Sequence, residues 1–151
     1  MRAAIAAARD GMRGDRGGPF GAVIVRGDGE IVARGCNEVK STNDPTAHAE
    51  VVAIRAAARA LGTPSLEGCA IYTSCEPCPM CLAAICWARL DRVFFASTSA
   101  DAAAAGFDDA LFYEEVCKPA AARAVPSANL LRNEAWPVMQ EWIDKADKAP
   151  Y

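Results

Sequence analysis

The stretches PTAHAEV at residues 45–51 and CEPCPMC at residues 75–81 decide how this chain folds and what it holds. The first contains His48, and the second contains Cys78 and Cys81, three residues apart. One imidazole nitrogen and two thiolates make a three-ligand zinc set that leaves the fourth position open for water. Because Cys78 and Cys81 are at i and i+3, both thiols leave one face of a helix's first turn. The positive end of that helix favours their thiolate forms, as the metal requires.

Two other interpretations of these residues stay open. A structural zinc site closes with a fourth protein ligand, and Cys75 forms a further Cys-x-x-Cys pair with Cys78. Cys75 lies upstream of Pro77, however, at the end of an expected strand. Metal-free cysteines in a core are the second interpretation, since free cysteine is among the most buried residue types. His-x-Glu followed by Pro-Cys-x-x-Cys favours an open, catalytic site, because that combination is typical of zinc deaminases.

Glu50 follows His48 by two residues and is the predicted general acid and base. Two thiolates neutralise the charge of a zinc dication, so this metal is a weaker Lewis acid than one held by three neutral histidines. An adjacent base therefore helps, and the single histidine of the chain is committed to the metal. We expect Glu50 to take the proton of the water and pass it to a ring nitrogen, then to the departing amine. The alternative is a carboxylate that only complements the helix dipole.

Composition limits the classes of protein to consider. The chain has 151 residues, one domain's worth, and a formal net charge of −3. A protein that grips nucleic-acid phosphates normally has a basic surplus, so we expect no nucleic-acid partner. The longest apolar run, residues 81–88, is far below the roughly 20 residues that span a bilayer. Seven cysteines, an odd number, and no signal-peptide core in residues 1–12 predict reduced thiols in the cytoplasm.

The order of expected elements predicts one α/β domain over residues 1–151, with a mixed sheet and helices on both faces. No internal repeat or long linker divides the chain. The expected helices cover residues 2–13, about 46–61, 77–90, 110–116 and about 134–148. The expected strands cover residues 21–26, 30–36, 69–74, 92–96 and, weakly, 123–131. The turn signal Gly27-Asp28-Gly29 joins the first two as an expected hairpin.

The chain resembles the cytidine-deaminase-like superfamily and, within it, the bacterial guanine deaminases. The resemblance extends beyond HAE and PCPMC and covers most of the chain. It implies a three-layer α-β-α fold on a five-stranded mixed sheet, one Zn2+ ion, a homodimer, and hydrolysis of guanine to xanthine and ammonia. The segments that carry it are GGPFGAVIV (17–25), STNDPTAHAEVVAIR (41–55), YTSCEPCPMCLAAICWAR (72–89) and DAAAAGFDDALFYEEV (101–116).

The resemblance also implies roles for single residues. The family's zinc ligands and proton-shuttling glutamate match the four residues already described. Asn37 matches an asparagine that hydrogen-bonds the base, Phe20 an aromatic residue that packs on the purine, and Ala49 a residue whose backbone contacts it. Trp87 follows the second zinc stretch; we expect its indole to fill core, and it is also a candidate for stacking on the substrate.

Asp109 is a second predicted catalytic and substrate-binding carboxylate. It matches the second aspartate of the family's GFDD motif, which reaches the amidine edge of the substrate and assists proton transfer. Guanine presents adjacent N1–H and 2-amino donors there, and one carboxylate accepts both. The alternative from spacing alone is that Asp108 or Asp109 caps the helix expected at residue 110, since aspartate is a favoured N-cap.

The C-terminal helix and tail, from about residue 132 to residue 151, form a predicted lid. In related proteins the tail covers the active site of a neighbouring subunit and closes it with a terminal aromatic residue. Tyr151 is the corresponding residue here, and water exclusion would help the chemistry. The alternative is a solvated terminus.

Other activities remain open at this stage. Guanosine deaminases share the GFDD motif, and s-triazine or isocytosine bases share the amidine edge. Adenosine deaminases acting on tRNA share HAE and PCxxC, but the acidic charge and the four lysines argue against a polyanionic substrate. A non-catalytic zinc-binding module is the remaining class, and it predicts a closed site that includes Cys75.

Overall fold

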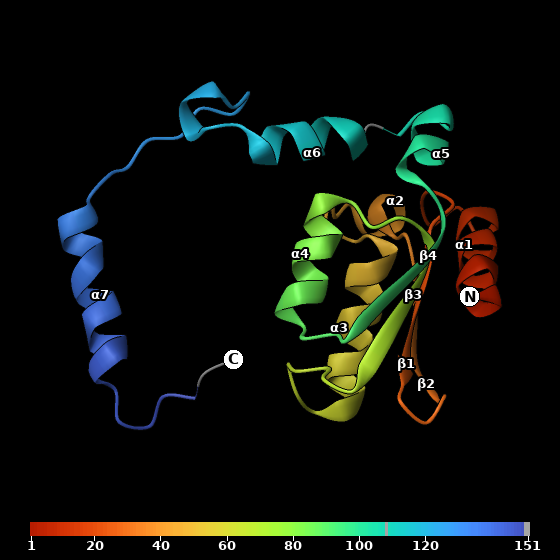
Figure 1. Ribbon diagram of the computed structural model, residues 1–151, viewed down its shortest axis with the longest axis horizontal. Coiled ribbons are helices and arrows are strands. Elements are labelled where there is room, and N and C mark those ends of the chain that lie inside the picture. Colours follow the sequence, from red (N-terminus) through yellow and green to blue (C-terminus); the bar gives the residue numbers. More distant parts are fainter. Residues whose placement is uncertain (108, 150–151) are drawn as a thin grey trace. The chain divides into compact units, whose positions relative to one another are not determined.

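The computed structural model describes residues 1–107 and 109–149 (Figure 1). The chain divides into two compact units, Met1–Glu114 and Glu115–Tyr151. The first unit contains the sheet and the two stretches with the predicted zinc ligands. The single domain expected over residues 1–151 stays a prediction.

The sheet has the strand order β2-β1-β3-β4. β1 (Gly21–Arg26) pairs antiparallel with both β2 (Ile31–Cys36) and β3 (Cys69–Cys75), whereas β3 pairs parallel with β4 (Arg92–Ser97). The expected hairpin between β1 and β2 is confirmed, and Gly29 adopts the positive φ of 92° that its tight turn requires. The two parallel strands end together, with Cys75 opposite Ser97. Their carboxyl ends are therefore the edge where a site is expected.

Helices cover both faces of the sheet, as the sequence predicts. α1 (Arg2–Arg13) packs on one face, and α3 (Ala49–Leu61) with α4 (Pro79–Trp87) covers the other (Figure 1). The buried side chains of α1 and α3 are nearly all alanine, which lets each helix lie close to the strands. A Cβ at Gly21 would lie 2.3 Å from the carbonyl oxygen of Ala4 in α1. The three-layer α-β-α architecture is confirmed.

Short helices carry the connections. α2 (Val39–Thr42) follows β2 and α5 (Ser99–Ala104) follows β4; the sequence patterns did not predict either. α5 has a capping box in which Thr98 and Asp101 satisfy each other's backbone N–H groups. α6 (Asp109–Cys117) begins in the first unit and ends in the second.

The five-stranded sheet expected from the resemblance is wrong for the described residues, in which the sheet has four strands. The segment expected as a weak fifth strand, residues 123–131, forms no strand and is exposed throughout. Pro126 cannot donate a ladder hydrogen bond, and the Ser-Ala-Asn sequence that follows it has low strand propensity. The second unit instead consists of the end of α6, a 3-10 turn (Ala120–Ala122) and α7 (Arg132–Asp144).

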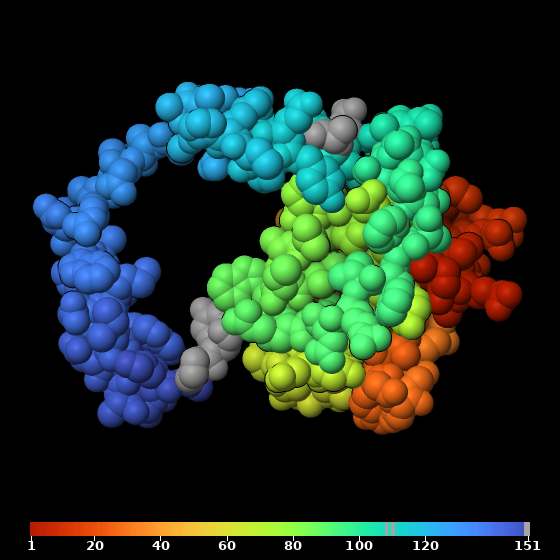
Figure 2. Space-filling view, viewed as in Figure 1, coloured from red at the N-terminus to blue at the C-terminus, as the bar shows by residue number. Residues whose placement is uncertain are grey.

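Both units leave large apolar side chains exposed. In the first unit they include Leu82 and Trp87 of α4 and Phe94 and Phe95 of β4. The surface of these two elements faces the viewer in Figure 2 (green). In the second unit α7 has no buried residue and exposes Trp136, Val138, Met139, Trp142 and Ile143. Within the described chain, no helix combines the length and the apolar character needed to cross a membrane.

Candidate active site

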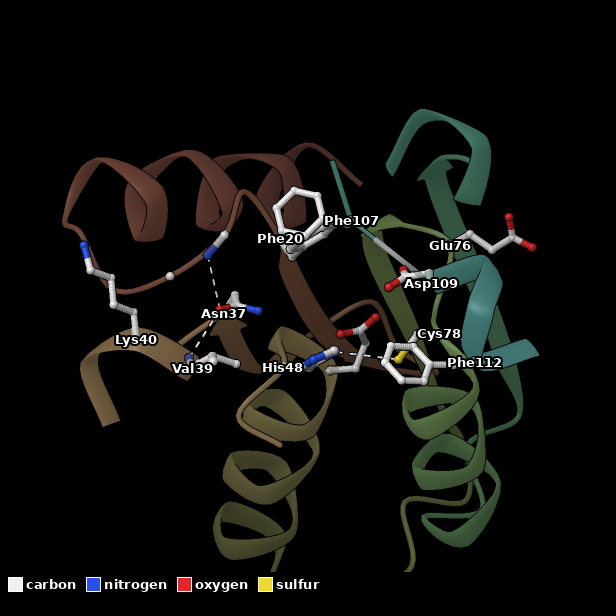
Figure 3. A pocket seen from close by; sticks show the side chains of 13 residues that line it. Phe20, Asn37, Val39, Lys40, His48, Glu76, Cys78, Phe107, Asp109 and Phe112 are labelled. Carbon is white, nitrogen blue, oxygen red and sulfur yellow. Dashed lines mark hydrogen bonds between the residues drawn. The ribbon is translucent and has the colours of Figure 1, made fainter. Parts of the chain in front are cut away.

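A cavity of about 390 Å3 lies where α3 and α4 begin, beside the carboxyl ends of β2 and β3 (Figure 3). It is lined by residues from the loop after α1, the end of β2, the first turn of α3, the loop before α4 and the first turn of α6. Six of the predicted site residues line it: Phe20, Asn37, His48, Glu50, Cys78 and Asp109.

His48, Cys78 and Cys81 come together as a candidate metal site. Their ligand atoms all lie within 4.8 Å of one another. His48 Nδ1 lies 3.6 Å from Cys78 Sγ and 3.5 Å from Cys81 Sγ. Zn–S and Zn–N bonds of ordinary length, at a tetrahedral angle, put sulfur and nitrogen about 3.6 Å apart. The three residues therefore fit a tetrahedral zinc ion without rearrangement.

Helix termini place these ligands. His48 is the extended residue immediately before α3, and Cys78 has the same position before α4. Pro79 begins α4, where its missing N–H costs nothing. Both helices therefore begin later than expected, so that His48 and Cys78 leave the chain just before the first turn. Cys81 follows in the first turn of α4 and is completely buried.

Cys75 is not a member of this group. Its thiol donates to the carbonyl oxygen of Thr98 at 3.5 Å. The closed four-ligand site considered from the sequence is therefore not formed by Cys75. In the described part of the chain, the cluster of potential metal ligands contains three residues.

The pKa values of the two ligand thiols shift in opposite directions. The hydrogen bond from Cys81, together with His48, lowers the pKa of Cys78 to about 4. The pKa of Cys81 is raised, because Cys78 as a thiolate holds the Cys81 proton and burial disfavours a second negative charge. The hydrogen bond to Cys78 likewise raises the pKa of His48. In the metal-free chain Cys78 is thus the thiolate and Cys81 the thiol.

Glu50 is a buried carboxyl group in the first turn of α3, 7% exposed, beside the metal ligands. Burial raises its pKa, and hydrogen bonds from its own backbone N–H and from Cys81 oppose that rise. A carboxyl group with a raised pKa can both accept and return a proton near neutral pH. Ala49, between His48 and Glu50, is buried as the first residue of α3.

Asn37 is buried and has a defined amide orientation. Its Oδ1 accepts hydrogen bonds from the backbone N–H groups of Gly18 at 3.2 Å and Val39 at 3.3 Å. The amide nitrogen therefore points toward the cavity, as Figure 3 shows, and is available as a donor. Gly17 makes room for this arrangement, since a Cβ there would lie 2.1 Å from Asn37 Oδ1.

Aromatic rings and a second carboxylate complete the cavity. Phe20 meets Phe107 edge to face, with ring centroids 4.7 Å apart and an interplanar angle of 77°. Asp109 is the first residue of α6 and half-buried, so it lines the cavity and also complements the helix dipole. Its charge contributes to the raised pKa of His48, which places it close to the metal ligands.

Of the predicted substrate contacts, Ala49 and Trp87 are not among the residues that line this cavity. Trp87, at the end of α4, is 65% exposed and lies under the guanidinium of Arg89; it fills no core. Tyr151 lies outside the described residues. Of the cysteines outside the two motif stretches, Cys36 and Cys69 are buried, as is usual for a free cysteine, whereas Cys86 and Cys117 are exposed.

The sequence analysis missed several lining residues: Val39, Lys40, Glu76, Phe107 and Phe112. Phe107 and Phe112 flank Asp109 in the sequence, and Phe112 is three residues beyond it on α6, so helical spacing could have identified it. Lys40 forms an ion pair with Asp15 at 2.5 Å, and no motif in the sequence signals this pairing.

Comparisons with known proteins agree with this geometry. Residues 1–97 match the family of the cytidine and deoxycytidylate deaminase zinc-binding region. The chain is 50% identical to a guanine deaminase of Bacillus subtilis over 151 residues, covering 100% of this chain and 96% of that protein. The X-ray structure of guanine deaminase from the same species superimposes with a TM-score of 0.95 at 51% identity, over 99% of this chain and 95% of that one. A tRNA-specific adenosine deaminase of Aquifex aeolicus is 47% identical over 79 residues, 52% of each chain.

Proposed function

The chain belongs to the family of the cytidine and deoxycytidylate deaminase zinc-binding region, and we propose that it hydrolyses guanine to xanthine and ammonia. One observation carries the proposal: the candidate three-ligand zinc site lies at a cavity that the carboxylates of Glu50 and Asp109 also line. Full-length similarity to a guanine deaminase supports the choice of base.

His48, Cys78 and Cys81 are the residues that hold the zinc ion. When bound, zinc supplies Lewis acidity that makes water a nucleophile at neutral pH. Every proton that moves must then be handled by the chain itself, and His48 is committed as a ligand. Glu50 is buried beside the ligands and is the group for this task.

Glu50 takes one proton from the attacking water and gives it to N3 of guanine as C2 becomes tetrahedral. It then takes the second proton of that water from the hydroxyl group on C2 and gives it to the departing amine, so both protons of the water are accounted for when ammonia leaves. Burial raises the pKa of Glu50, which makes its carboxylate a better proton acceptor than an exposed one and suits it to this exchange.

Three residues orient the base. Asp109 accepts the N1–H and 2-amino hydrogens at the amidine edge and assists proton transfer there. Asn37 donates from its amide nitrogen to an acceptor of the purine, and Phe20, braced by Phe107, packs on the ring face. The backbone of Ala49 contacts the base beside His48.

We further propose that the working form is a homodimer in which the C-terminal segments are exchanged. The apolar side chains exposed on α4 and β4 of the first unit, and those of α7, support it, because a monomer rarely leaves so many large apolar groups in water. The segment from about residue 132 to residue 151 is the proposed lid, with Tyr151 as the closing residue. Seven cysteines without a disulfide support a cytoplasmic site of action. The proposed substrate is a purine base, which supports a role in purine metabolism.

Guanosine is the second candidate substrate, because a ribose at the cavity mouth would need only space. A tRNA substrate has less support, since the tRNA deaminase match covers about half of the chain and the net charge is negative.

Ammonia release by the purified, zinc-loaded protein tests the proposal, with guanine, guanosine and a tRNA anticodon stem-loop supplied separately. We expect release from guanine. Release from guanosine alone would keep the zinc chemistry and change the substrate. Release from the stem-loop alone would assign the chain to the tRNA deaminases, and no release from any of them would indicate a non-catalytic zinc module.

A further inference from the structure

We propose that the hydroxyl group of Tyr113 is a positioning group that holds the Asp109 carboxylate in place relative to the zinc ligand Cys78. The inference rests on the proposed function, because it concerns how that substrate is held. The Tyr113 hydroxyl donates to the carbonyl oxygen of Pro77 at 2.7 Å. Pro77 is the residue directly before Cys78. This hydrogen bond therefore joins the helix that carries Asp109 to the loop that carries the metal ligand.

The spacing within α6 makes Tyr113 suitable for this role. Asp109 and Tyr113 are four residues apart on the same helix, so their side chains leave the same face, one turn apart. A contact that fixes the direction of Tyr113 fixes the rotation of α6 about its own axis. The direction of Asp109 is then fixed as well.

The loop before α4 is already held from its other side. Cys75 donates to the Thr98 carbonyl at 3.5 Å, Glu76 N–H donates to the Ser97 carbonyl at 2.8 Å, and Ser99 N–H donates to Glu76 Oε2 at 2.9 Å. Pro77 has no N–H group, so its carbonyl is the backbone polar atom by which that residue can be held. The Tyr113 hydroxyl donates to that oxygen, so the well-held loop fixes the position of α6.

Few apolar contacts hold α6 in the first unit. Leu111 is 52% exposed and Phe112 is 55% exposed. A helix with so little buried apolar surface depends more than usual on its polar contacts for position. Displacement of a substrate-orienting group by about 1 Å can cost on the order of 100-fold in rate. Loss of the Tyr113 hydrogen bond would thus let the Asp109 carboxylate move relative to the bound base, and a small movement would lower the rate.

Tyr113→Phe removes the hydroxyl and keeps the ring. We expect kcat/KM for guanine to fall roughly five- to tenfold, the usual effect of one lost hydrogen bond, while the zinc content stays at that of the wild type. The dissociation constant of guanine, measured in the Glu50→Gln background so that turnover is slow compared with the binding measurement, should rise by a similar factor. Tyr72→Phe is the matched control, because Tyr72 lies on β3 with its ring stacked on Phe94; it should change neither quantity.

A double-mutant cycle separates positioning from a general structural role. In the Asp109→Asn background, Tyr113→Phe should have little further effect on kcat/KM or on guanine binding, because the group it positions is already lost. Fully additive effects, unchanged guanine binding in Tyr113→Phe, or loss of zinc would overturn the proposal.

Amide hydrogen exchange of the zinc-loaded protein tests the inference independently of substrate. Tyr113→Phe should speed exchange in α6 and leave α3 unchanged. If wild type releases no ammonia from guanine, the proposed function fails, yet this experiment still judges the positioning of α6: equal protection of α6 in wild type and variant would refute it.

Discussion

Gly35 of β2 lies so close to Ala49 of α3 that a Cβ at residue 35 would be 2.4 Å from the Ala49 carbonyl oxygen. The same Cβ would be 2.7 Å from the backbone nitrogen of Ala53. Ala49 stands between His48 and Glu50, so this contact sets how deeply the metal ligand and the buried carboxylate enter the cavity. A strand and a helix can approach to this distance only where the strand has no side chain.

Gly35→Ala should therefore destabilise the fold and disturb the metal site together. A Cβ forced against helix backbone costs about 1–3 kcal/mol of unfolding free energy, as overpacking in a core does. Urea unfolding of the zinc-loaded protein measures this, and a chelator competition measures zinc affinity, which should fall. Gly27→Ala is the control, because its Cβ would meet only the Gly68 carbonyl at 3.5 Å. Equal unfolding midpoints for Gly35→Ala and wild type would contradict the close approach.

Glu50→Gln should retain zinc and lose turnover. The amide keeps the shape of the side chain but cannot take a proton from water, so the rate should fall by about 10²–10⁴-fold. Ammonia release and metal analysis of the same sample test this. Glu67→Gln makes the same chemical change at an exposed position and should be fully active. Near-normal turnover by Glu50→Gln would exclude the proposed proton transfer.

Asn37→Asp should impair substrate binding with little loss of stability. The new carboxylate still accepts the N–H groups of Gly18 and Val39, but it no longer donates to the base. We expect kcat/KM for guanine to fall roughly 10- to 100-fold, since a buried polar group of the substrate loses its partner. Thermal unfolding should change little, and Asn43→Asp, on an exposed turn, should match wild type. An equal loss for both variants would point to added charge as the cause.

Removal of zinc should abolish activity, and the affinity for zinc should rise with pH. The pKa of Cys81 is raised in the metal-free chain, so Cys81 is a thiol there and must release its proton when the metal binds. Each proton released makes the affinity rise about tenfold per pH unit. Titration of the metal-free protein with zinc at several pH values measures the slope. A slope of zero would show that both thiols are already deprotonated.

Deletion of residues 134–151 should give a monomer with weakened guanine turnover, if the C-terminal segments are exchanged as proposed. Light scattering and ammonia release on the same preparation test both consequences. Trp142→Asp is the control for misfolding of the truncated chain. It charges one exposed side chain of α7, keeps the full length of the chain and leaves the first unit unchanged. A fully active monomeric truncation would refute the lid.

Two pairs of residues in the candidate site depend on short-range relationships, which the sequence shows directly. Cys78 and Cys81 are three residues apart at a helix start, and Glu50 is two residues from His48, so covalent connection alone brings each pair together. The predicted hairpin between β1 and β2 followed from turn chemistry at its tip, again a local property. The expected fifth strand was wrong because strand formation depends on pairing with a neighbouring strand. That pairing cannot be predicted from residues 123–131 alone.

What the sequence by itself determined was the two local pairs, His48 with Glu50 and Cys78 with Cys81, since residue type and spacing suffice for these. Only the tertiary structure brings His48 Nδ1 to 3.6 Å and 3.5 Å from the thiols of Cys78 and Cys81, which lie about 30 residues further along the chain. Only the tertiary structure decided that Cys75 donates to Thr98 instead of joining the metal ligands. It also decided that the amide nitrogen of Asn37 points toward the cavity and that Tyr113 on α6 holds the Pro77 carbonyl. These contacts join segments far apart in the chain, and their directions depend on the packing of α3, α4 and α6 around the sheet.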